Sequence, residues 1–234
     1  MLSTKALARI GGVLYLAVGV LGAFSEYVRT SATVSGDAAA TAANVSAHAT
    51  LFHAGIVSDL IDFTCFLGVG LVMYAILKPV SPGAALAMLV INAVSIPIQA
   101  LNMLNQAGAL LAATDPSYGA GPTTVMWLLE MHRQGYLIAQ IFFGLYLLPL
   151  GYLVYRSGLF PKILGVVLAA GAAGYVGGVA AAFASPGFQS GVALYFGIAG
   201  GVAELAFLLW LLVMGASVPT SDRTLRVGAV GESA

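Results

Sequence analysis

The sequence contains few charged residues. Asp, Glu, Lys and Arg make up only 8% of its 234 residues, against the roughly 25% that is typical of a soluble domain. Hydrophobic residues make up 60%. A soluble fold with so few charges could not cover its surface with polar side chains. The composition therefore excludes an ordinary soluble domain and predicts a protein that crosses a membrane several times.

Other scarcities exclude further classes of function. Lys and Arg together number 9, as do Asp and Glu, whereas a nucleic-acid-binding domain needs a basic excess. The single cysteine, Cys65, excludes an intrachain disulfide and any C-x-x-C redox or zinc motif. The 3 histidines, with His48 and His53 in or near a loop, do not form a metal-binding pattern. We therefore expect no nucleic acid, no cofactor and no metal.

Long apolar runs make up most of the chain. Six of them reach the roughly 20 residues that a helix needs to cross a bilayer, and they cover residues 8–28, 51–77, 84–113, 123–155, 162–184 and 191–214. The predicted fold class is all-α: a polytopic membrane bundle of six transmembrane helices within residues 1–214, followed by a disordered cytoplasmic tail at 215–234. We expect Pro97 and Pro149 to kink their helices, and Gly135 to separate a short outer helix from the fourth span.

Basic residues predict the orientation, because cytoplasmic loops of membrane proteins are enriched in Lys and Arg. The side that carries the N-terminus would hold Lys5, Arg9, Lys78, Arg156, Lys162, Arg223 and Arg226, and the outer side only Arg29 and Arg133. We therefore expect both termini in the cytoplasm and the protein in the cell (inner or plasma) membrane. Cleavage of residues 1–25 as a secretory signal stays open as an alternative, although glycines at helical spacing favour a packed first helix.

Polar residues interrupt the apolar runs mainly in the half expected to face outside. Asp59 and Asp62 share one face of the second run, within "LFHAGIVSDLIDF". A charge that faces lipid costs roughly 2.5–3.5 kcal/mol. The third run carries polar residues spaced 3, 4, 3 and 4 apart, which places them on one helix face, namely Asn92, Ser95, Gln99, Asn102 and Gln106. These faces predict a shared cavity that opens to the outside. Asp37 is a good helix N-cap, and we expect the short helix that follows it to lie over the mouth of the cavity.

The carboxyl groups predicted for this region outnumber the basic groups. Like charges in a low dielectric cannot all ionise, so at least one carboxyl should be protonated or bound to a cation. The candidate ligand-binding or proton-site residues are Asp59, Asp62, Glu204, Glu26, Glu130, His132, Arg133, Gln99 and Asn102. A purely structural polar network would give the same pattern.

Several segments carry a family resemblance: "SGDAAATAAN", "LFHAGIVSDLIDF", the Lys78-Pro79 turn and the block from Gly135 to Tyr175. In these the chain resembles the bacterial integral membrane family catalogued as domain of unknown function 4386, over most of residues 6–184. The resemblance implies an integral inner-membrane protein of about this length, with no assigned activity. In that family a histidine often stands where this chain has Tyr146, and the difference weakens a haem or metal role at that position.

Three functions remain open. The first is binding or transport of a small apolar or cationic molecule through an outward-facing acidic cavity. The second is an intramembrane enzyme that uses buried carboxylic acids on a lipid or isoprenoid, although no GxSxG, HExxH, Walker or Rossmann motif occurs. The third is a structural or partner-binding protein. Membrane lipids are expected partners, and a homodimer is an option.

Overall fold

The computed structural model describes residues 2–184 and 192–216. Its elements are α1 (Thr4–Ala32), α2 (Ala38–Ala47), α3 (Ala49–Leu77), α4 (Pro82–Thr114), the short 3-10 helix η1 (Pro116–Tyr118), α5 (Pro122–Ser157), α6 (Lys162–Ala184) and α7 (Val192–Val213). The part of the chain that the structure describes contains no strand. The predicted all-α fold is therefore confirmed.

Five helices, α1, α3, α4, α5 and α6, are long and apolar enough to cross a membrane. The predicted span at 191–214 coincides with α7, whose apolar part within the described residues is the shorter stretch Gly200–Val213. Of the predicted tail at 215–234, residues 217–234 lie outside the described residues.

Short polar side chains begin several helices. The Ser3 hydroxyl accepts a hydrogen bond from the Ala6 amide at 3.2 Å, and the Asp37 carboxylate accepts one from the Ala40 amide at 2.9 Å. Such N-caps satisfy amides that have no partner within the helix. The short helix predicted after Asp37 is confirmed, and it is α2.

The prediction that Gly135 separates two helices is wrong, because α5 runs unbroken from Pro122 to Ser157. The glycine serves packing instead. A Cβ atom on Gly135 would collide with the side-chain oxygen of Asn102 on α4. Because glycine has no Cβ, the Asn102 side chain can lie against the α5 backbone. Pro97 and Pro149 lie inside α4 and α5 and end neither helix.

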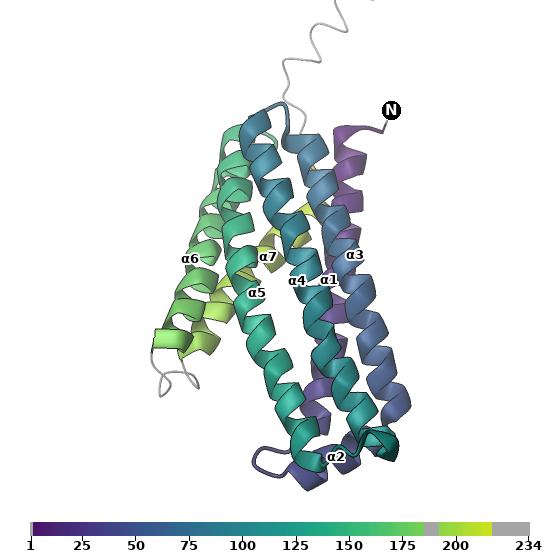
Figure 1. The fold of residues 1–234 in the computed structure, drawn as a ribbon. Coiled ribbons are helices and arrows are strands. Elements are labelled where there is room, and N and C mark those ends of the chain that lie inside the picture. Colours follow the sequence, from purple (N-terminus) through teal and green to yellow (C-terminus); the bar gives the residue numbers. More distant parts are fainter. Residues whose placement is uncertain (1, 185–191, 217–234) are drawn as a thin grey trace, which may run out of the picture.

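The long helices pack in a closed ring, with α1 on α3, α3 on α4, α4 on α5, α5 on α6, α6 on α7, and α7 on α1. Helix α2 lies across the end of the bundle opposite the N-terminus and packs against α4 and α5 (Figure 1). Helices α5 and α6 approach closely where glycines face each other. A Cβ on Gly165 would lie only 2.6 Å from the carbonyl oxygen of Gly151.

Apolar side chains form two buried clusters. The larger one joins α1, α3, α4, α5, α6 and α7 and includes Met73, Leu147 and Leu211. The smaller one lies beneath α2 and includes Val45 and Phe52. Many of the buried polar groups come from α1, α3, α4 and α5, and these are the helices that hold the candidate site.

Candidate functional site

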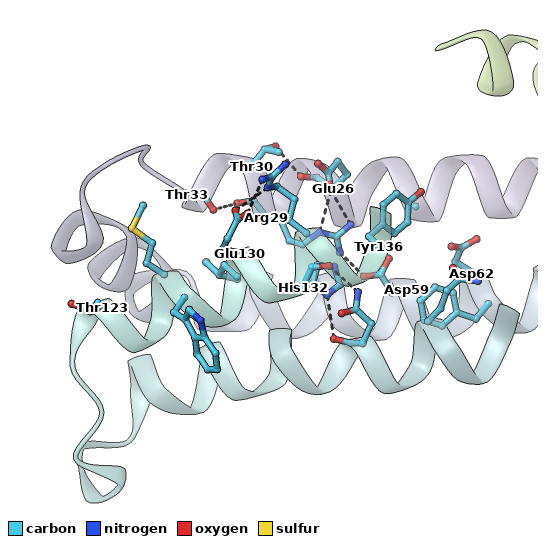
Figure 2. A pocket seen from close by; sticks show the side chains of 18 residues that line it. Glu26, Arg29, Thr30, Thr33, Asp59, Asp62, Thr123, Glu130, His132 and Tyr136 are labelled. Carbon is cyan, nitrogen blue, oxygen red and sulfur yellow. Dashed lines mark hydrogen bonds and ion pairs between the residues drawn. The ribbon is translucent and has the colours of Figure 1, made fainter. Parts of the chain in front are cut away.

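A cavity of about 700 Å³ lies among α1, α3, α4 and α5 (Figure 2). This volume is within the roughly 300–1,000 Å³ that small-molecule sites occupy. Eight of the predicted site residues line it, namely Glu26, Asp59, Asp62, Gln99, Asn102, Glu130, His132 and Arg133. The remaining candidate, Glu204, does not line it. The face of α3 that carries both aspartates is therefore one wall of a real cavity.

Arg29 is the centre of the polar network in this cavity. Its Nη1 lies 2.5 Å from Asp59 Oδ2 and also donates to Ser25 Oγ at 2.7 Å and to Gln106 Oε1 at 3.1 Å. Ser25 Oγ in turn donates to Asp59 Oδ2 at 2.6 Å. The side chains of Arg29 and Asp59 are only 12% and 6% exposed. Asp59 is thus held by a buried cation and a hydroxyl.

The outer part of the Arg29 guanidinium binds a second acid. Its Nε and Nη2 donate to Glu26 Oε2 at 3.1 and 3.0 Å. The Glu26 side chain is 62% exposed, so this pair lies at the edge of the cavity. The sequence assigned Arg29 only to the outer side, and the structure adds that its side chain lies between two acidic side chains.

Asp62 is in a different environment from Asp59, although it lies one helical turn away. It lies roughly halfway along α3, and no dashed line reaches it in Figure 2. Its Oδ1 is buried and has no hydrogen-bond partner among the described residues. Helix α1 passes close to Asp62 at Gly22. A Cβ atom added to Gly22 would lie 3.6 Å from Asp62 Oδ2.

The polar stripe of α4 faces inward as predicted, and Asn92, Ser95, Gln99, Asn102 and Gln106 are all buried. Two of its amides bind neighbouring backbones. Asn102 Nδ2 donates to the carbonyl of His132 on α5 at 2.8 Å, and Asn92 Nδ2 donates to the carbonyl of Phe66 on α3 at 3.1 Å. The stripe therefore joins helices as well as lining the cavity.

On α5, the predicted pair of Glu130 and Arg133 lies at the cavity edge. Arg133 Nη2 and Nε donate to the two carboxylate oxygens of Glu130 at 2.6 and 2.8 Å, and Gln134 Nε2 adds a third bond at 2.7 Å. His132 points inward and is 5% exposed. Its Nδ1 lies 3.4 Å from the carbonyl oxygen of Asn102. The charge of Glu130 is therefore balanced by Arg133 on the same helix.

Glu204 occupies a separate site between α1, α6 and α7. The Tyr15 hydroxyl donates to its Oε1 at 2.5 Å, and the Tyr175 hydroxyl donates to its Oε2 at 2.6 Å. Tyr146 belongs to the same cluster of buried side chains as Tyr15, and its hydroxyl has no partner among the described residues. No spacing in the sequence marks Tyr15 or Tyr175 as a partner of Glu204.

No group of three or more His, Cys, Asp or Glu side chains that could hold a metal ion occurs within residues 2–184 and 192–216. Outside the membrane-spanning helices, hydrogen bonds from Ser117 lower the pKa of the exposed Asp115 carboxyl. This carboxyl caps the η1 turn and lies away from the cavity.

Long apolar helices around a cavity lined by charged and apolar side chains define a multi-pass membrane protein. The chain belongs to the family described as Domain of unknown function (DUF4386), whose model matches residues 10–215. It is also 32% identical, over 78 residues, to a protein of Archaeoglobus fulgidus described as "Uncharacterized protein". That match covers 33% of this chain and 44% of the relative, so it spans less than half of the relative's length. No solved structure matches.

Proposed function

We propose that the protein binds a small organic cation with an apolar body in the cavity, as a carrier or receptor at the outer half of the membrane. The observation that carries the proposal is the Asp62 carboxyl, which lines the cavity and has a buried oxygen without a partner. A cationic group in the cavity beside this carboxyl would balance the charge of its ionised form.

The charges that line the cavity support a cationic ligand. Carboxyl groups come from Glu26, Asp59, Asp62 and Glu130, and guanidinium groups from Arg29 and Arg133. Four acids minus two bases leaves an excess of two acids. Because Arg29 and Arg133 are both engaged with acids inside the cavity, an anionic ligand would have to break these pairs.

The remaining lining is suited to an apolar or aromatic body. Phe63, Met126, Trp127, Leu129 and Tyr136 contribute apolar and aromatic surface to the same cavity. An organic cation gains attraction from the face of an aromatic ring and gains free energy when its apolar groups leave water. A small hydrated metal ion would gain nothing from these side chains.

We place the protein in the plasma membrane with six spans, counting α7 as the sixth, and with both termini in the cytoplasm. The N-terminus and α2 lie at opposite ends of the bundle (Figure 1). The basic residues Lys5, Arg9, Lys78, Arg156 and Lys162 lie in or near α-helix ends on the N-terminal side. The positive-inside rule then puts the cavity and α2 on the outer side. Arg223 and Arg226 lie outside the described residues.

Binding fits the geometry better than the alternative of an intramembrane enzyme acting on a lipid. General acid catalysis with a stabilising carboxylate needs two acids that act together in a closed pocket. Here Asp59 is tied to Arg29, and exposed side chains such as Glu26 border the cavity. The two aspartates therefore have different environments rather than forming a buried acid pair.

Native mass spectrometry of the detergent-purified protein, with organic extraction of retained molecules, tests the proposal. Wild type is compared with Asp62→Asn, and Asp37→Asn is the matched control. Asp37 is an exposed helix cap, where asparagine caps equally well. We expect a defined cationic molecule in wild type and control, and at least a tenfold loss in Asp62→Asn. Bulk phospholipid alone in all three proteins would contradict the proposal and favour a structural role.

A further inference from the structure

The carboxyl groups around the cavity differ in how they are stabilised. Asp59 has Arg29 and Ser25, Glu26 has Arg29, and Glu130 has Arg133. Asp62 has an oxygen that is completely buried and receives no hydrogen bond from the described residues. An ionised carboxylate in that position would lack the donors that a buried charge requires.

The groups that face Asp62 make its ionised form still less favourable. The titratable or charged side chains around it are Asp59 and Cys65 on its own helix, Glu26 and Arg29 on α1, His132 and Tyr136 on α5, and Glu204 on α7. Helix α4 presents the uncharged Gln99 and contains no titratable residue. Of the two guanidinium groups that line the cavity, Arg29 already binds two other carboxylates and Arg133 binds Glu130.

Glu204 is stabilised differently from Asp62. Both of its oxygens accept a phenolic hydrogen bond, from Tyr15 and Tyr175. It also lies off the cavity, so a ligand seated against Asp62 does not touch it. Asp62 is the acid that is both in the cavity and without its full set of donors.

Building on the proposed function, we propose that Asp62 holds a proton while the cavity is empty and releases it when an organic cation binds, so that one cation enters for each proton that leaves. The O–H bond of the carboxyl breaks and the proton passes to the outer water. The resulting carboxylate pairs with the cation, and no other bond changes. The net charge of the cavity stays constant, so neither state buries an unpaired charge.

This exchange predicts a specific dependence on pH. Proton and cation compete for one carboxylate, so raising the pH favours the cation. The apparent affinity should rise tenfold per pH unit as long as Asp62 is protonated in the empty protein, because the two binding events are thermodynamically linked. A permanently charged cation is the right probe, since a proton that appears on binding must come from the protein.

The experiment uses the full-length protein in detergent and tetraphenylphosphonium as the probe. Binding is measured by calorimetry in two buffers of different ionisation enthalpy, and protons are counted with a pH-indicator dye in weakly buffered solution. Tetraphenylborate, which has the same shape and the opposite charge, controls for apolar binding. Asp37→Asn is the variant in which release should persist. Asp62→Asn should bind at least tenfold more weakly, release no proton and show no rise of affinity with pH.

The outcomes separate this inference from the proposed function. Release of one proton per bound tetraphenylphosphonium, abolished in Asp62→Asn, supports both. Binding without proton release overturns the exchange and leaves the cation site standing. Release that persists in Asp62→Asn overturns the assignment to Asp62. Absence of binding, or equal binding of tetraphenylborate, overturns both. A protonated carboxyl band in the infrared difference spectrum that disappears on binding gives an independent measurement on the wild-type protein alone.

Discussion

Asp59 and Asp62 lie one turn apart on the same face of α3, yet replacement of each by asparagine should have very different effects on stability. Asp59→Asn removes the negative partner of a guanidinium whose side chain is 12% exposed. Breaking a buried ion pair by removing one partner costs about 3–5 kcal/mol, because the remaining charge stays uncompensated. Arg29 retains Glu26 and Gln106, so we expect a loss near the lower end, about 3 kcal/mol.

Asp62→Asn removes no donated hydrogen bond from the buried oxygen. It replaces a titratable group by a neutral amide of the same shape. The expected change in the free energy of unfolding is therefore small, within about 1 kcal/mol and of either sign. The two substitutions are chemically identical, so the difference between them reports the environment rather than the side chain.

The assay is reversible unfolding in mixed micelles at neutral pH, with helicity followed by circular dichroism. A difference of about 2–4 kcal/mol between Asp59→Asn and Asp62→Asn is expected. Equal losses in the two variants, or a larger loss in Asp62→Asn, would show that Asp62 has a stabilising partner and would refute the reasoning. Ser25→Ala, which removes a donor to Asp59, should give an intermediate loss of about 1–3 kcal/mol.

Two further comparisons test the packing in the same unfolding assay. Tyr15→Phe removes a donor to Glu204 and should cost about 1–3 kcal/mol of stability. Tyr146→Phe removes a buried hydroxyl without a partner and should be neutral or stabilising. A larger loss for Tyr146→Phe than for Tyr15→Phe would contradict the assigned hydrogen bonds. Gly165→Ala would force a Cβ against the α5 backbone and should cost about 1–3 kcal/mol. Gly201→Ala meets open space and should gain up to about 1 kcal/mol, so equal effects at the two glycines would refute the close approach of α5 and α6.

Much of the fold could be predicted from the sequence, because a bilayer imposes simple rules. Span length and hydropathy predicted the long helices, and Asp37 predicted the start of α2. The error at Gly135 has a general cause. Glycine was interpreted by its low helix propensity, whereas in an apolar bundle its small size is used for close packing. That role depends on the partner, here Asn102, and one helix alone does not reveal it.

The site was predictable where one helix carries the pattern. The inward stripe of α4 followed from its spacing, and the shared face of Asp59 and Asp62 followed from theirs. The count of basic residues assigned Arg29 only to the outer side and said nothing of the direction of its side chain. Its inward direction depends on Asp59, on another helix. The contacts of Glu204 depend on three helices, and no local pattern predicts them.

The hydrogen bond between Tyr15 and Glu204 has a consequence for the order in which the chain assembles in the membrane. The pair of Arg29 and Asp59 joins residues only 30 positions apart and can form as soon as α3 follows α1 into the bilayer. Tyr15 and Glu204 are 189 positions apart, so their bond waits for the last helix. During synthesis the helices that line the cavity, α1, α3, α4 and α5, can therefore pack together first. The contact between α1 and α7, here called the seam, forms last. A chain that stops before α7 would keep the cavity and lose the seam.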